Sequence, residues 1–290
     1  MENKNNKFIL MIKCPDKPGI IAAVSNFLYS SSYNILESSQ FKDAENNKFF
    51  MRVCFTSIKL NTNINKETIA FNNFKSIASK FDMKYEFFDM SKKQKVLLMV
   101  SKFGHCLNNI LYQWKTESIR VDIPLIISNH EDMREVVKPY GIKYIHLPIN
   151  KKNKLAQEEQ LQSLVSSHKI DVIVLARYMQ ILSSGISKSM KGKIINIHHS
   201  FLPSFKGARP YNQAFEKGVK IIGATAHYVT EHLDEGQIIE QDVARVDHTK
   251  TLNNFVSIGR DIENVVLARA IRWHTEHRVI INGNRTVVFN

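Results

Sequence analysis

Hydrophobic residues in the first ninety positions follow two different periods, which together predict a small mixed unit. Continuous or alternating apolar runs are typical of strands, and apolar residues that recur every three or four positions are typical of helices. The strand-like runs cover residues 7–13, 33–41, 48–57 and 83–90, and the helical patterns cover 20–28 and 69–78. The order is βαββαβ, a ferredoxin-like arrangement in which two helices cover one face of an antiparallel sheet.

The pattern changes after the polar run 91–95, which we interpret as a linker. Beyond it, the strand-like runs are continuously apolar, which indicates burial on both faces and hence a parallel sheet. They cover residues 96–101, 124–128, 171–175 and 193–197, with helical patterns over 105–114, 131–140 and 154–168. The alternation predicts an open, mostly parallel α/β sheet. We therefore expect an α/β protein with domains over residues 1–90 and 96–290.

Composition narrows the class of protein. The 290 residues are 43% hydrophobic and 23% charged, which excludes a disordered chain, a collagen and a disulfide scaffold. No apolar run reaches the roughly 18 residues that a membrane-spanning helix needs, and no signal peptide is recognisable. We expect a cytoplasmic protein without a membrane partner.

The net charge of +13 favours anionic partners. No cluster of basic residues accompanies it, so we expect no nucleic-acid partner. The three cysteines, Cys14, Cys54 and Cys106, lie far apart in the sequence, which suggests reduced thiols and neither a metal site nor a disulfide.

Candidate chemistry gathers at the end of the strand predicted over residues 193–197, because functional groups of open parallel sheets collect beyond the carboxyl ends of strands. Alternation places Asn196 and His198 on the same side of that strand. Asp234 follows in a later loop, and His227 precedes it. An amide, an imidazole and a carboxylate can polarise a carbonyl and move protons without a covalent nucleophile. On spacing alone, an Asn-x-His pair at the end of a strand is more often structural than catalytic, and a core position for His227 is also open.

Two longer motifs resemble a known family. Residues 196–207 (NIHHSFLPSFKG) resemble the signature of the folate-dependent formyltransferases, and residues 233–239 (LDEGQII) resemble their aspartate loop. The double histidine, together with residues 207–211 (GARPY), 221–228 (IIGATAHY) and 283–287 (GNRTV), is most similar to members that hydrolyse 10-formyltetrahydrofolate to tetrahydrofolate and formate. The resemblance therefore implies a hydrolase of one-carbon metabolism that supplies formate for purine synthesis.

The resemblance also assigns roles by position. It implies that Asn196, His198 and Asp234 are catalytic and that His227 supports Asp234. It further implies that the pterin of the folate substrate is bound by Leu175, Ala176, Arg177, Tyr178, Met179, Ile181 and Gly207. Water would be the formyl acceptor, and no cofactor is implied.

The acceptor distinguishes this hydrolysis from transfer to an amine. Members that transfer the formyl group to a ribonucleotide carry a glycine- and serine-rich loop for its phosphate. Residues 101–108 (SKFGHCLN) contain one glycine and bulky side chains at that position, which favours water. Transfer to an amine, and a folate sensor without turnover, remain the alternatives.

The N-terminal unit, with residues 15–20 reading PDKPGI, resembles an ACT domain. The resemblance implies a homo-oligomer, either a dimer or a tetramer, and an amino-acid effector such as methionine or glycine. The candidate effector residues are Asp16, Pro18, Gly19 and Ile20, because a glycine lets backbone approach a ligand closely. A purely oligomerising domain is the alternative.

Overall fold

The computed structural model describes residues 7–58, 64–150, 152–202 and 210–290. The described chain forms two compact units. The first comprises residues 1–92, 276–280 and 287–290, and the second comprises residues 93–275 and 281–286.

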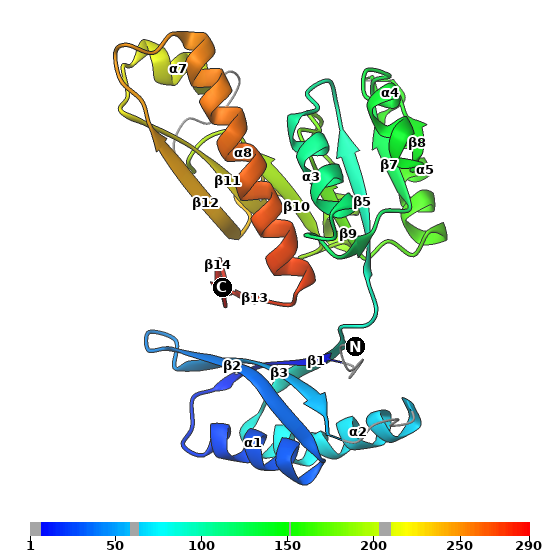
Figure 1. The fold of residues 1–290 in the computed structure, drawn as a ribbon, viewed down its shortest axis with the longest axis vertical. Helices are drawn as coiled ribbons and strands as arrows, with labels where there is room; N and C mark the ends of the chain where they lie inside the picture. The colour runs from blue at the N-terminus through cyan, green and yellow to red at the C-terminus, as the bar shows by residue number, and fades with distance from the viewer. Residues whose placement is uncertain (1–6, 59–63, 151, 203–209) are drawn as a thin grey trace. The chain divides into compact units, whose positions relative to one another are not determined.

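The first unit has the predicted βαββαβ order (Figure 1). Its elements are β1 (Lys7–Pro15), α1 (Ile20–Ser30), β2 (Tyr33–Asp43), β3 (Lys48–Ser57), α2 (Ile64–Phe81) and β4 (Lys84–Asp89). The four strands form an antiparallel sheet in the order β2-β3-β1-β4, with both helices on one face. The ferredoxin-like arrangement is thereby confirmed.

Alternation along β1 explains why the sheet is covered on both faces. Phe8, Leu10 and Ile12 point into the core that α1 and α2 close, together with Val24 and Phe74. Side chains at the intervening positions face the other way, where a smaller apolar cluster forms. That cluster consists of Met11, Phe50, Ile280, Val287 and Phe289.

The C-terminal segments correct the expected domain boundaries, since residues 276–280 and 287–290 belong to the first unit rather than to the second. Arg52 of β3 explains the difference. Its side chain is 3% exposed and donates to the carbonyl oxygens of Glu276 and His277 at 3.1 and 3.0 Å. It also donates to Glu37 at 3.0 Å. A buried guanidinium needs such acceptors, and the end of the chain supplies them.

The second unit contains the remaining elements. They are β5 (Gln94–Val100), α3 (His105–Lys115), β6 (Val121–Asp122), β7 (Leu125–Ser128), α4 (Arg134–Val137), η1 (Lys138–Tyr140), β8 (Lys143–His146), α5 (Lys154–Ser167), β9 (Val172–Leu175), α6 (Ser184–Ser189), β10 (Ile194–His198), α7 (Pro210–Glu216), β11 (Ile221–Tyr228), β12 (Ile238–Arg245) and α8 (Leu252–Thr275). The last two strands, β13 (Val279–Asn282) and β14 (Arg285–Val288), form a hairpin. Its residues 281–286 belong to the second unit, and the residues on either side of them belong to the first.

One large sheet organises this unit in the order β12-β11-β10-β9-β5-β7-β8. The strands from β10 to β8 are parallel, and β11 and β12 are antiparallel, so the predicted open, mostly parallel α/β sheet is confirmed. Helices α3 and α8 lie side by side on one face, and α8 packs on β11 and β12 (Figure 1). No helix within the described ranges is both long and apolar enough to cross a membrane.

Three local expectations differ from the structure. The helix expected over 131–140 is reduced to α4 and a 3-10 turn, because Pro139 lacks the backbone N–H that a continuing helix uses. Strand β5 begins inside the expected linker, since Gln94 and Lys95 pair with β6. Helix α8 was not anticipated, although its buried residues include Ile262, Val266 and Leu267 at helical spacing.

Candidate active site

Asn196 and His198 lie at the carboxyl end of β10, as alternation along the strand predicted. Strand β10 runs between β9 and β11, and Asn196 is directly opposite His227 on β11. The side chain of His198 is 6% exposed. Strand geometry therefore brings an amide and two imidazoles to one edge of the sheet.

The loop after β11 carries Asp234 to the same place. Asp234 has a φ of 56°, a left-handed conformation that Asp tolerates better than most residues. Gly236 allows the loop to lie against β11, because a Cβ at this position would meet the Tyr228 carbonyl oxygen at 1.6 Å. The Asp234 carboxylate thereby comes within 3.2 Å of His198 Nδ1 and 3.6 Å of His227 Nε2.

Hydrogen bonds to His227 orient the Asn196 amide. The Nδ1–H of His227 donates to the Tyr228 carbonyl oxygen at 2.9 Å, which leaves Nε2 as an acceptor in the neutral ring. Asn196 Nδ2 lies 3.2 Å from that nitrogen and donates one of its two N–H bonds. Within the described part of the chain, no hydrogen bond uses the second amide N–H.

Electrostatics keep the carboxylate ionised. The hydrogen bond from His198, followed by the interaction with the neighbouring His227 ring, lowers the pKa of Asp234 well below its ordinary value, against the opposing effect of burial. His198 Nε2 is buried and has no hydrogen-bond partner among the described residues. The site therefore joins an ionised carboxylate to an imidazole whose far nitrogen has no hydrogen-bond partner among the described residues.

The segment after β9, expected to bind the pterin, is fixed to the end of β5. Ala176 donates to the Met99 carbonyl at 2.8 Å, and the Arg177 carbonyl accepts from Ser101 at 3.2 Å. Met179 donates its N–H to Ser101 Oγ at 3.0 Å. Leu175 ends β9 and is buried, whereas Met179 and Ile181 are 52% and 60% exposed.

Two residues of this segment point into the protein instead. The Tyr178 hydroxyl is buried and accepts from Gln157 Nε2 at 3.1 Å. Arg177 has a φ of 66°, and its side chain lies beside Glu263, with Nε 3.4 Å from Oε2. Gly207, the remaining expected contact, lies outside the described residues.

His199 follows the last residue of β10, and its ring lies beside that of His198, with the ring centroids 5.3 Å apart. Burial, followed by the nearby charge of Arg177, lowers the pKa of His199 to about 3, so its ring is neutral. It borders an almost wholly apolar cavity of about 430 Å³. The cavity is lined by His199, Ser200, Phe201, Pro210, Tyr211, Ala214, Ile221, Ile222, Gly223 and Val243, none of which was expected to bind substrate.

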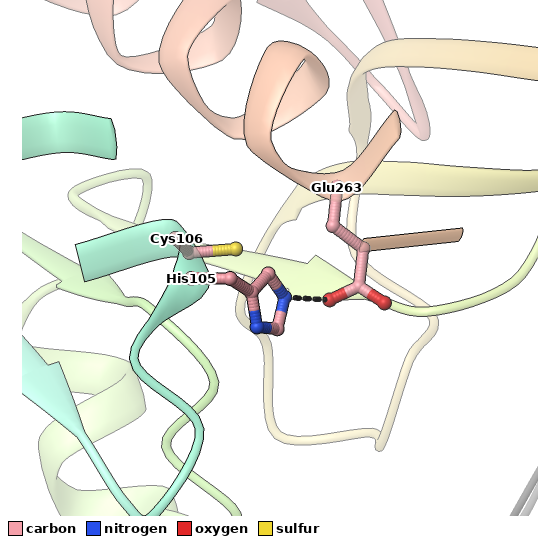
Figure 2. Close-up of side chains that lie close together, drawn as sticks. All are labelled: His105, Cys106 and Glu263. Carbon is pink, nitrogen blue, oxygen red and sulfur yellow. Dashed lines mark hydrogen bonds and ion pairs between the residues drawn. The ribbon is translucent and has the colours of Figure 1, made fainter. Parts of the chain in front are cut away.

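A buried polar cluster joins α3 to α8, and sequence reasoning did not anticipate it. His105 Nε2 lies 2.8 Å from Glu263 Oε2, and the Tyr211 hydroxyl donates to Glu263 Oε1 at 2.6 Å. Cys106 completes the group (Figure 2). The cluster was missed because its parts lie 158 residues apart in the sequence. A carboxylate at position 263 on the buried face of α8 is the signal that could have revealed it.

The candidate effector turn in the first unit is ordered by its own contacts. Asp16 pairs with Lys42 at 2.7 Å and donates its N–H to the Asn47 carbonyl at 3.0 Å. Gly19 has a φ of 91° and precedes α1, while Pro18 is exposed and Ile20 is buried.

Comparison with known proteins identifies the family of the chain. The profile of the family described as Formyl transferase matches residues 94–271. A formyltetrahydrofolate deformylase of Bacillus subtilis is 45% identical over 100% of this chain and 96% of its own length. A crystal structure of a formyltetrahydrofolate deformylase from Pseudomonas syringae pv. tomato superposes with a TM-score of 0.94 at 45% identity, covering 100% of this chain and 96% of that one.

A second group of structures resembles part of the chain. Glycinamide ribonucleotide transformylase 1 from Symbiobacterium toebii has a TM-score of 0.65 at 26% identity, and the match covers 70% of this chain and 97% of that one. Full-length similarity therefore extends to the deformylases, which match the N-terminal unit as well. The chain belongs to the formyl transferase family and, within it, to the formyltetrahydrofolate deformylases.

Proposed function

We propose that this protein hydrolyses 10-formyltetrahydrofolate to tetrahydrofolate and formate. The similarity to proteins named formyltetrahydrofolate deformylase over the whole chain supports this activity. The observation that carries the mechanism is the pairing of His198 Nδ1 with Asp234 Oδ2 at 3.2 Å, while His198 Nε2 stays without a partner among the described residues. The formate would feed purine synthesis in the cytoplasm, the predicted location.

In this proposal, Asn196 and His198 hold the formyl oxygen. The second N–H of the Asn196 amide and the Nε2–H of a His198 imidazolium, whose Nδ1–H is bonded to Asp234, donate to that oxygen as water attacks the formyl carbon. Negative charge develops there in the tetrahedral intermediate, and donors that are already oriented stabilise it more than they stabilise the ground state.

Asp234 orients the water and the His198 ring. Its lowered pKa makes the carboxylate a weak base, so its main effect is to stabilise an imidazolium and to accept a hydrogen bond from the attacking water. When the carbon–nitrogen bond breaks, the proton lost by the water passes to N10 of the leaving tetrahydrofolate. His198 and Asp234 lie where they can relay it.

The segment over residues 175–181 is the proposed pterin site. Its backbone is tied to β5 through Met99 and Ser101, which gives a rigid support, and Met179 and Ile181 expose apolar surface at the same end of the sheet. Arg177 contributes its backbone here, because its side chain is engaged with Glu263. A contact from Gly207 stays a prediction.

Water is the proposed acceptor. The loop after β5, where a phosphate would be bound in a ribonucleotide transformylase, carries Phe103, with Arg177 and Arg260 near its ring at 5.8 and 5.5 Å. His105, which follows, is bonded to the buried Glu263 carboxylate. The bulky Phe103 and the engaged His105 side chain make this loop a poor cradle for a phosphate.

The test is formate release from 10-formyltetrahydrofolate without any amine acceptor. Hydrolysis predicts multiple turnovers whose rate is unchanged by added glycinamide ribonucleotide. Release that requires the ribonucleotide would favour the transferase, and folate binding without turnover would favour a sensor.

The N-terminal unit is proposed to regulate or assemble the enzyme. Its similarity to an ACT domain supports an amino-acid effector, methionine or glycine, at Asp16, Pro18, Gly19 and Ile20, and a homo-oligomeric dimer or tetramer. Titration calorimetry with each amino acid, compared between the natural chain and Gly19→Ala, tests the site. Equal heats for the two proteins would exclude this turn.

A further inference from the structure

We infer that His105, Cys106 and Glu263 form a binding site for one divalent transition-metal ion of the zinc class. One imidazole nitrogen, one thiol sulfur and one carboxylate oxygen of these residues all lie within 4.8 Å of one another. Figure 2 shows the imidazole and the thiol at the start of α3 reaching toward the carboxylate on α8.

The donor set selects the class of ion. An imidazole, a thiolate and a carboxylate are ligands of Zn²⁺ and of neighbouring ions such as Co²⁺, whereas Mg²⁺ and Ca²⁺ prefer oxygen ligands alone. Three protein ligands leave a fourth position of a tetrahedral ion open. Water or hydroxide would fill it.

The carboxylate is already oriented for coordination. The Tyr211 hydroxyl donates to Glu263 Oε1 at 2.6 Å, which leaves Oε2 facing His105. Gly259 permits this contact, because a Cβ there would meet the Tyr211 ring at 2.1 Å. Ligating carboxylates commonly have such a supporting hydrogen bond on the other oxygen.

The metal would take the place of a shared proton. His105 Nε2 and Glu263 Oε2 face each other at 2.8 Å across a hydrogen bond. Two ligands of tetrahedral zinc stand about 3.3 Å apart, given bonds of about 2.0 Å. A side-chain movement of about half an ångström therefore opens the space, with the imidazole proton moving to Nδ1.

Burial and charge are compatible with one bound ion. Cys106 and Glu263 are each 0% exposed, whereas the His105 side chain is 15% exposed and marks the side from which an ion enters. Coordination releases the thiol proton to solvent, so thiolate and carboxylate balance the ion. Arg177 lies 3.4 Å from Glu263 Oε2 and leaves one net positive charge, which favours hydroxide over water at the open position.

The experiment uses the full chain, freed of metal with a chelator and titrated with Co²⁺ in the absence of folate. We expect one ion per chain, the visible bands of tetrahedral Co²⁺ and a near-ultraviolet sulfur-to-cobalt charge-transfer band. Added Zn²⁺ should displace the bound Co²⁺ and abolish both sets of bands. Because no substrate is present, the result does not depend on deformylase activity.

Variants and a direct probe of the ligands decide the assignment. Cys106→Ser should abolish the charge-transfer band, and His105→Gln or Glu263→Gln should weaken affinity by at least about tenfold. Cys54→Ser, at a part-exposed thiol of the first unit, is the matched control. This variant should keep both the charge-transfer band and the metal affinity of the natural chain. Circular dichroism checks that each variant folds.

X-ray absorption at the zinc edge of the natural chain keeps the test independent of the variants. One sulfur and two or three nitrogen or oxygen neighbours would support the site. A first shell without sulfur, a charge-transfer band that persists in Cys106→Ser, or no stoichiometric binding by the natural chain would overturn it.

Discussion

Gly236→Ala tests how the carboxylate loop is held against the sheet. A Cβ at this position would lie 1.6 Å from the Tyr228 carbonyl oxygen and 2.7 Å from its carbonyl carbon. Both are backbone atoms of β11, so no side chain can rotate away to relieve the clash. Since a Cβ and a carbonyl oxygen need about 3 Å, the loop must move outward by roughly 1.4 Å, and Asp234 is two residues away.

The expected loss follows from that displacement. A misplacement of about 1 Å in a catalytic group costs on the order of 10²-fold in rate. This loss corresponds to about 2.7 kcal/mol in the activation free energy. We therefore expect kcat/KM of Gly236→Ala to fall by about 10²-fold in an acceptor-free assay of formate release, with the variant still folded at the assay temperature.

Gly218→Ala is the matched control. Gly218 has a φ of 60° and open space around its Cβ position, so the substitution strains the backbone without moving the Asp234 loop. It should lower the melting temperature slightly and leave kcat/KM unchanged. Natural activity in Gly236→Ala, or equal losses in the two variants, would refute the reasoning.

Three other perturbations have definite expected outcomes. Asn196→Ala or His198→Ala should each lower kcat by about 10²–10³-fold while the melting temperature stays near that of the natural chain, and undiminished turnover would remove that residue from the mechanism. Asp234 has a lowered pKa in the folded protein, so its carboxylate stabilises the fold above the unfolded pKa of about 3.9, and this contribution is lost as the pH falls further. The difference in free energy of unfolding between the natural chain and Asp234→Asn, measured with urea, should therefore shrink below about pH 4, and a constant difference would contradict the assigned ion pair. Arg52→Met should lower the free energy of unfolding by about 2 kcal/mol, because the backbone carbonyl oxygens of Glu276 and His277 lose a buried cationic donor, while Glu37 keeps Arg278. Urea denaturation that shows less than about 1 kcal/mol of loss would mean that the C-terminal segment is held by its apolar contacts instead.

The local pattern of apolar and polar residues predicted much of the fold, and it predicted that Asn196 and His198 lie together. The strand that carries Asn196 and His198 is short, apolar and alternating, and both its position and the common side of these residues follow from the period alone. The period does not predict that the Asp234 carboxylate lies beside His198. That position depends on the left-handed backbone of Asp234 and on Gly236, which lies against the neighbouring strand. Spacing offered Asp234 as a candidate carboxylate in a later loop, and the family resemblance assigned its catalytic role.

Contacts between distant residues account for what the sequence could not predict. The pairing of His105 with Glu263 requires α3 and α8 to pack together, and no local period encodes which helices become neighbours. The return of the C-terminus to the first unit depends on Arg52, whose acceptors lie more than two hundred residues away in the chain. An isolated arginine within an apolar strand carries no information about its partner.

His198 and Asp234 are proposed to act as one unit on a single formyl group. The most direct test is the turnover rate of the double variant His198→Ala/Asp234→Asn, compared with the two single variants in the acceptor-free formate assay. Residues that act through each other lose most of the rate at the first substitution. We predict that the double variant is no slower than the slower single variant, and a rate reduced by the product of the two separate losses would contradict the account.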